Sequence, residues 1–107
     1  MKCEIIQKTP YRVELVCENF ASFSFDTMRL RMNNTELIFL MQTIDRLLCC
    51  IVLSKTFSRI FHNDMECQYN WETDTWGFNS PYMNCWLYKK EIILIIETIK
   101  KWVKDIR

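Results

Sequence analysis

Two long stretches of this 107-residue chain repeat apolar residues with the period of an amphipathic helix. The first follows the tripeptide NNT and covers residues 36–53, and the second covers residues 89–105. In both, apolar residues recur at i, i+3, i+4, i+7, i+10, i+11 and i+14, which marks one face of a helix. The pattern therefore predicts two helices, with Asn33, Asn34 or Thr35 as the cap of the first.

Shorter stretches alternate apolar and polar residues, which is the period of a half-buried strand. The segment 20–32 changes phase, because its early apolar positions are odd and its later ones are even, so we expect a turn or bulge near Asp26 and Thr27. Residues 62–64 indicate a turn, and residues 73–82 indicate a loop or hairpin. The expected strands cover residues 3–8, 11–18, 28–32, 56–61, 66–72 and 83–88.

Each predicted helix also carries an apolar pair outside its main stripe, Ile38-Phe39 in the first and Ile93-Leu94 in the second. Two helices side by side on a sheet would cover both the stripes and the pairs. We therefore expect one α+β domain over residues 1–107, in which an antiparallel sheet of five or six strands carries two helices on one face. In the alternative, Ile38, Phe39, Ile93 and Leu94 form the interface of a homodimer.

The two strand-then-helix patterns match each other at an offset of 55 positions. The identical helix residues are Glu36, Thr43 and Ile44 in the first pattern and Glu91, Thr98 and Ile99 in the second. The strand positions that match best, at an offset of 54, are Val13, Leu15 and Cys17 with Cys67, Tyr69 and Trp71. An internal duplication with halves at about 1–53 and 54–107 would explain the match. Any two strand-then-helix units with a shared core need similar apolar faces, however, so both interpretations stay open.

The composition is that of a folded globular chain, with 50% hydrophobic, 14% aromatic and 25% charged residues. The net charge of +1 lacks the positive excess typical of proteins that bind phosphate backbones, so we expect no nucleic-acid partner. The longest apolar run, residues 47–53, is too short for a membrane span, and the N-terminal residues contain no apolar signal core. We therefore expect no membrane partner and a cytoplasmic location in a bacterial or host cell.

Six cysteines and one histidine limit the chemistry that the side chains can offer. Without a signal core we expect reduced, buried thiols, and Cys49-Cys50 fall on an apolar helical stretch. No Cys-x-x-Cys spacing occurs, so we expect neither a metal nor a cofactor. The single glycine argues against a phosphate-binding loop. An enzyme would have to pair His62 with Cys67 or Cys85, and we expect no enzymatic activity.

Residues 63–86 combine aromatic and acidic side chains without a lysine or arginine. Tyrosine and tryptophan are frequent anchors in protein interfaces. Strand alternation points Tyr69 and Trp71 inward. The alternative is that half of these aromatic residues fill the core. The residues that we expect to face a protein partner are Trp76, Phe78, Tyr82, Trp86, Glu72 and Asp74.

The segment CENFASFSFDTMRLRMNNTELIFLMQTI, residues 17–44, resembles small Bacteroidota proteins of unassigned function. In those proteins a cysteine pair leads into two short strands and a helix. This chain departs from the pattern at Phe20, which stands where the second cysteine would be. The resemblance implies no activity.

A small domain with an acidic and aromatic segment and no catalytic set favours a non-enzymatic protein that occludes or sequesters a protein partner. Phage inhibitors of host defence, which serve antiviral defence evasion, and immunity proteins that neutralise toxins act in this way. The first alternative is a small-ligand sensor with a pocket between sheet and helices. The others are an enzyme built on His62 and a structural homodimer.

Overall fold

The computed structural model describes residues 1–23, 26–53, 59–62 and 64–106, and it describes no side chain at residues 48, 50–53 and 59–62. Within these residues the chain forms seven strands and two helices. In chain order they are β1 (Lys2–Gln7), β2 (Arg12–Glu18), β3 (Thr27–Asn33), α1 (Asn34–Leu53), β4 (Arg59–His62), β5 (Met65–Asn70), β6 (Thr75–Asn79), β7 (Asn84–Tyr88) and α2 (Lys89–Asp105).

The strands form two antiparallel sheets, one in the order β1-β2-β3 and the other in the order β4-β5-β6-β7. The predicted α+β class and antiparallel pairing are confirmed, but the single sheet of five or six strands is wrong. Within each sheet, every described strand pairs with the strand next to it in the sequence. The 20-residue helix α1 separates β3, the last strand of the first sheet, from β4, the first strand of the second. Strand β6 lies within residues 73–82, where the pattern indicated a loop or hairpin.

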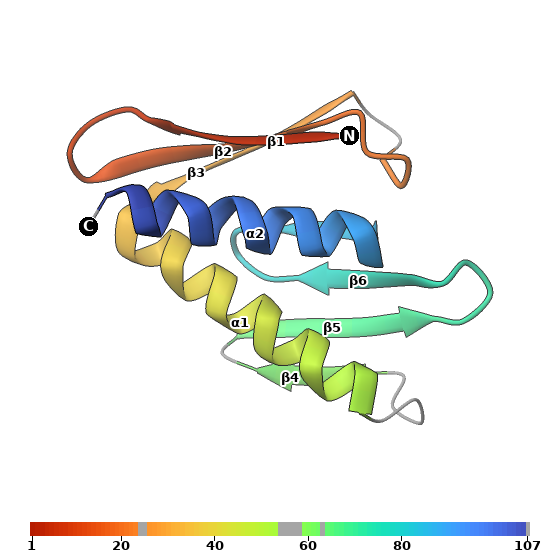
Figure 1. Cartoon of the computed structure of the whole chain (residues 1–107). Coiled ribbons are helices and arrows are strands. Elements are labelled where there is room, and N and C mark those ends of the chain that lie inside the picture. Colours follow the sequence, from red (N-terminus) through yellow and green to blue (C-terminus); the bar gives the residue numbers. More distant parts are fainter. Residues whose placement is uncertain (24–25, 54–58, 63, 107) are drawn as a thin grey trace.

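The helices do not lie side by side on one face of one sheet, as predicted, but contact both sheets. Helix α2 packs against β1 and β7, whereas α1 packs against β2 and β3 on one side and against β4 and β5 on the other. In Figure 1 the first sheet lies above α2, and α1 crosses in front of β4 and β5. The helices also contact each other, so the hydrophobic cluster between the layers includes residues from both halves of the chain.

The predicted helical stripes supply most of this cluster. In α1 and α2 the described stripe residues are buried, except at the C-terminal end of α2, where Val103 is half-buried and Ile106 is exposed. The largest fully buried apolar side chains are Phe78, Leu15, Leu37, Ile44, Leu47, Met65, Leu87, Ile92, Ile95 and Ile99. Of the described helices, none is both long enough and apolar enough to cross a lipid bilayer.

The phase change between β2 and β3 is explained by the loop that joins them. Cys17 pairs with Met28 across the ladder, and Asn19 adopts a positive φ of 56° where the chain leaves β2. The loop returns to the sheet at Asp26 and Thr27, as predicted. Within it the rings of Phe20 and Phe23 stack with centroids 4.9 Å apart.

The first turn of each helix contains a glutamate that accepts a backbone hydrogen bond from the helix N-terminus. In α1 the amide of Glu36 donates to Asn33 Oδ1 at 2.7 Å, and the amide of Asn33 donates to Glu36 Oε1 at 3.1 Å. This reciprocal arrangement is a capping box, with Asn33 as one of the three predicted caps. In α2 the amide of Tyr88 donates to Glu91 Oε1 at 2.7 Å. The identical glutamates thus cap corresponding helices.

Each capping glutamate also binds the loop of the other half of the chain. The hydroxyl of Tyr82, in the turn before β7, donates to Glu36 Oε2. The hydroxyl of Ser22, in the loop before β3, donates to Glu91 Oε1 at 2.6 Å. The two halves are therefore linked by the same kind of contact in both directions.

The pairing of strands corrects one part of the internal match. Strand β3 precedes α1 as β7 precedes α2, and the ladder neighbours of β3 and β7 are β2 and β6. The residues in β6 that correspond to Val13 and Leu15 are Trp76 and Phe78 rather than Cys67 and Tyr69. The common origin of the two halves stays a prediction, whereas their common architecture is observed.

Candidate functional site

Two of the four aromatic residues predicted to face a partner are buried. Trp76 is 6% exposed and Phe78 is 1% exposed, so the prediction is wrong for both. Strand β6 lies inside the second sheet, and the period of the strand turns both side chains toward the helices. Across the ladder, Trp76 is opposite Tyr69 and Phe78 is opposite Cys67. Tyr82 and Trp86 are exposed, as predicted.

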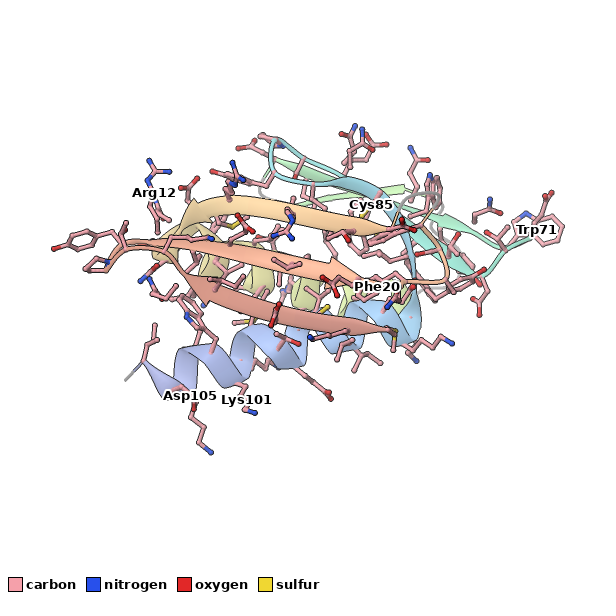
Figure 2. The ribbon with its side chains drawn as sticks, turned by 90° about the horizontal axis from the view of Figure 1, so that it is seen from above. Arg12, Phe20, Trp71, Cys85, Lys101 and Asp105 are labelled. Carbon is pink, nitrogen blue, oxygen red and sulfur yellow. The ribbon has the colours of Figure 1, made fainter. Side chains whose placement is uncertain are left out.

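Trp71 is 76% exposed, although the alternation predicted that it points inward. Strand β5 ends at Asn70, and Trp71 lies in the turn at the tip of the β5–β6 hairpin, which Figure 2 shows projecting from one end of the molecule. The chain returns into β6 through Asp74, which has a positive φ of 53°. Glu72 and Asp74 are exposed beside Trp71, as predicted.

Asp74 also fixes this hairpin through Tyr69, whose hydroxyl donates to Asp74 Oδ1 at 2.5 Å. This hydrogen bond raises the pKa of Tyr69, because it stabilises the protonated phenol. The ring of Tyr69 packs on that of Trp76, with centroids 4.8 Å apart. Tyr69 is thus half-buried, and the predicted inward orientation holds for its ring.

Trp86 lies across Gly77 on the face of the second sheet that points away from the helices. Gly77 pairs with Trp86 in the ladder, and a Cβ atom at Gly77 would lie 2.9 Å from three atoms of the indole. The only glycine of the chain is therefore required because the indole lies directly on its backbone. Around it a hollow of about 140 Å³ is bordered by Glu66, Gln68, Asn79 and Asn84.

A second hollow continues from this one toward α1. It shares Glu66 and Asn79 with the hollow at Trp86 and adds Asp64, Ser80 and Pro81. Asp64, which has a positive φ of 61°, lies in the turn that leads into β5. The two hollows are therefore neighbours on the surface.

The third hollow, of about 300 Å³, lies between the N-terminal half of α1 and the turns that flank the second sheet. It shares Asp64, Ser80 and Pro81 with the second hollow. Its apolar lining includes Phe39, Leu40, Met65 and Tyr82. We call these three neighbouring hollows the acidic band; its charged and aromatic residues are Glu36, Asp64, Glu66, Phe39, Tyr82 and Trp86.

The described lining of the acidic band contains more acidic than basic side chains. Among the described residues that line the three hollows, Glu36, Asp64 and Glu66 are acidic and none is a lysine or arginine. Hydrogen bonds from the Tyr82 hydroxyl and the Asn33 amide lower the pKa of Glu36, so this carboxylate is charged at neutral pH. The hydrogen bond that Tyr82 donates to Glu36 raises the pKa of the Tyr82 hydroxyl.

The four residues predicted to form a dimer interface differ in exposure. Phe39 and Ile93 are exposed, whereas Ile38 and Leu94 are half-buried and pack on the core cluster. Phe39 belongs to the acidic band, and Ile93 lines a separate hollow with Ala21 and Tyr88. The homodimer stays a prediction.

The structure describes two of the three side chains from which an enzyme could have been built. Cys67 and Cys85 are buried, and burial raises the pKa of each thiol to about 12, so neither is a thiolate at neutral pH. The side chains of His62 and Cys50 lie outside the described residues, and Cys49 is exposed rather than buried as predicted. Among the described residues, no three His, Cys, Asp or Glu side chains converge as metal ligands would.

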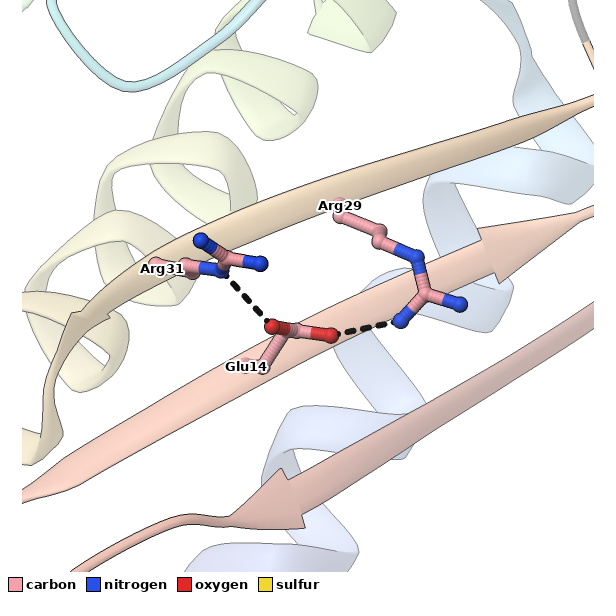
Figure 3. Close-up of polar contacts among 3 residues, drawn as sticks. All are labelled: Glu14, Arg29 and Arg31. Carbon is pink, nitrogen blue, oxygen red and sulfur yellow. Dashed lines mark hydrogen bonds and ion pairs between the residues drawn. The ribbon is translucent and has the colours of Figure 1, made fainter.

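Sequence reasoning missed an ion-pair cluster on the outer face of the first sheet. Arg29 Nη1 donates to Glu14 Oε1 at 2.6 Å and Arg31 Nε donates to Glu14 Oε2 at 2.9 Å (Figure 3). Both hydrogen bonds lower the pKa of Glu14, and the bond from Arg31 has the larger effect. Glu14 lies on the outer face of β2, but the arginines cover it so fully that its side chain is 2% exposed. The cluster joins β2 to β3 and leaves both arginines exposed.

Comparison of the chain with protein-family models, with curated protein sequences and with solved structures found no match. The resemblance of residues 17–44 to small Bacteroidota proteins therefore stays a prediction.

Proposed function

We propose that this chain is a non-enzymatic interaction protein that binds a basic segment of a protein partner along the acidic band and thereby occludes it. The observation that supports the proposal is the adjacency of the three hollows, which share lining residues and bring exposed aromatic side chains near three carboxylates. Phage-encoded inhibition of host defence and neutralisation of a toxin are the two settings that we propose for such occlusion.

The aromatic residues supply the anchors for this binding. Trp86 is 43% exposed, Phe39 is 46% exposed and Tyr82 is 37% exposed, so each offers ring surface to a partner while its other side is supported by the fold. Truncation of tryptophan and tyrosine anchors weakens protein complexes more than truncation of other side chains does. Lysine and arginine side chains also bind to aromatic faces, which suits a basic partner.

The carboxylates supply orientation and speed of association. An acidic surface attracts a basic one over distances set by the ionic strength, and the attraction mainly raises the association rate. Glu36 already accepts the hydroxyl hydrogen of Tyr82, so both groups present acceptor atoms to a ligand. The acidic band therefore favours ligands rich in hydrogen-bond donors.

A quantitative pull-down from the native host tests the proposal. The bait proteins are the wild type, Trp86→Ala in the acidic band and Trp71→Ala at the hairpin tip. Glu97→Gln, on an exposed position of α2, serves as the control. The melting temperature of each variant is measured first, because Trp86 covers Gly77. The proposal predicts that Trp86→Ala loses the partner, whereas Glu97→Gln retains it.

Cross-linking of the captured complex assigns the surface. Cross-links from partner lysines to Asp64 or Glu66 would support the acidic band. Retention of the partner by Trp86→Ala together with its loss in Trp71→Ala would move the interface to the hairpin tip and contradict the proposal. If no protein is captured by both the wild type and Glu97→Gln, the result would count against an interaction protein altogether.

The hollow of about 300 Å³ also favours a second function, the binding of a small ligand by a sensor. Its apolar lining and its acceptor atoms at Glu36 and Tyr82 suit an organic amine with an apolar body. A thermal-shift screen with phenethylamine as the probe and phenylethanol as its neutral control tests this idea, because a bound ligand raises the melting temperature. A shift with the amine alone would support the sensor, and no shift with either probe would contradict it.

A further inference from the structure

Two cysteine thiols lie against each other between the first two strands, far from the residues of the acidic band in sequence. Cys3 on β1 and Cys17 on β2 are directly opposite in the antiparallel ladder, and their sulfur atoms are 3.2 Å apart. Directly opposite residues bring their Cβ atoms close to the separation that a disulfide uses. A disulfide holds its sulfur atoms at about 2.05 Å, so bond formation needs an approach of only about 1.2 Å.

The two thiols differ in accessibility, which sets the order in which they react. Cys3 is half-buried on the edge strand of its sheet, whereas Cys17 is completely buried. The hydrogen bond with Cys3, and then burial, raise the pKa of Cys17, so Cys17 keeps its proton while Cys3 reacts. Cys3 is therefore the thiol that a reagent reaches first, and Cys17 is the thiol that resolves the product.

We propose that Cys3 and Cys17 form a reversible dithiol–disulfide site that reacts with low-molecular-weight disulfides, for which glutathione disulfide is the probe. The Cys3 thiolate attacks one sulfur of glutathione disulfide, forms a mixed disulfide and releases one glutathione thiolate. Cys17 then loses its proton to the buffer, attacks the Cys3 sulfur and releases the second glutathione thiolate. The two cysteines are oxidised, and one glutathione disulfide is reduced to two glutathione molecules.

The disulfide would fasten the edge strand that supports α2. Strand β1 packs against α2, and Trp102 Nε1 donates to Gln7 Oε1 at the far end of β1 at 3.2 Å. A bond between Cys3 and Cys17 closes the β1–β2 hairpin and reduces the conformational freedom of the unfolded chain. Oxidation therefore raises the melting temperature. This inference is independent of the function proposed for the acidic band.

Intact-mass measurement after incubation with glutathione disulfide tests the site. All proteins carry Cys49→Ser and Cys50→Ser, because the exposed thiol of Cys49 would take up glutathione on its own. With both strand cysteines present, the protein is expected to lose two hydrogen atoms, to retain no glutathione and to melt at a higher temperature. Further substitution of Cys17→Ser should trap one glutathione on Cys3, and further substitution of Cys67→Ser should change nothing.

Peptide mapping under non-reducing conditions identifies the bond without reliance on the variants. A disulfide between the peptides that contain Cys3 and Cys17 is the expected result. A protein that stays fully reduced, a stable mixed disulfide on Cys3 with Cys17 intact, or a disulfide that includes Cys67 or Cys85 would each overturn the proposal.

Discussion

Glu91 is the buried carboxylate that joins the two halves of the fold, and its replacement by alanine gives a large predicted loss of stability. The side chain accepts hydrogen bonds from the Tyr88 amide at 2.7 Å, from the Ser22 hydroxyl at 2.6 Å and from the Ser22 amide at 3.3 Å. Glu91 is 0% exposed, so water cannot replace these acceptor atoms without rearrangement of the loop. The Glu91→Ala variant leaves three donors without their partner.

The magnitude follows from the two short bonds. A hydrogen bond to a charged group contributes about 1.5–3 kcal/mol, and the bond at 3.3 Å is too long to add much. Two short bonds at about 1.5–2.5 kcal/mol each predict that Glu91→Ala lowers the free energy of unfolding by about 3–5 kcal/mol. The loss is large beside a total stability of about 5–15 kcal/mol for a typical domain.

The matched control is Glu36→Ala, which removes the corresponding cap from α1. Glu36 is half-buried, so water can reach the donors that it leaves, and its loss of stability is expected to be clearly smaller. Urea denaturation followed by tryptophan fluorescence measures both variants under identical conditions. A loss below about 1 kcal/mol in Glu91→Ala, or an equal loss in Glu36→Ala, would refute the argument that burial decides the cost.

Three further predictions concern the sheet and the acidic band. Gly77→Ala should lower the free energy of unfolding by about 1–3 kcal/mol, because the new Cβ displaces the indole of Trp86. Calorimetry that finds the same stability for this variant as for the wild type would contradict the prediction. Phe78→Ala should lower the free energy of unfolding by about 3–5 kcal/mol in denaturant titrations, because Phe78 is buried. A soluble variant as stable as the wild type would indicate that Phe78 lies on the surface. Tyr82→Phe should destabilise the protein above pH 4.5, the ordinary pKa of Glu36, and progressively less as the pH falls and the carboxylate protonates. Urea midpoints of the wild type and Tyr82→Phe from pH 7 to pH 2 check this pH dependence. A difference in midpoint that stays constant over this range would contradict the prediction.

The periodic elements could be predicted from the sequence because their periods are local. The bounds of α2 and the turn near Asp26 agree with the structure, and the observed cap, Asn33, is one of the three that the sequence allowed. Each of these features depends on residues within a few positions of each other. The pairing of strands depends instead on contacts between distant segments, and alternation alone does not distinguish one sheet from two.

The candidate site was predictable only in part, for the same reason. The alternation in residues 66–72 was correct up to Asn70, but it could not show that the chain turns before Trp71. Trp76 and Phe78 were assigned to the surface because they fell in a segment with loop-forming residues, whereas the ladder with β5 and β7 places them in the core. The hollow between Tyr82 and Phe39 unites residues 43 positions apart, which no local pattern indicates. The single glycine was the available signal for Trp86, because a glycine within a strand marks a close approach.

The affinity of the captured partner for variants of this chain without two carboxylates decides whether the acidic band is the binding surface. The double variant Asp64→Asn/Glu66→Gln removes two charges of the acidic band, and asparagine also accepts the positive φ at position 64. We expect this variant to bind the captured partner at least about tenfold more weakly than Glu97→Gln at low salt, and we expect the difference to shrink at high salt. Equal affinities of the two variants at low salt would contradict the acidic band as the binding surface.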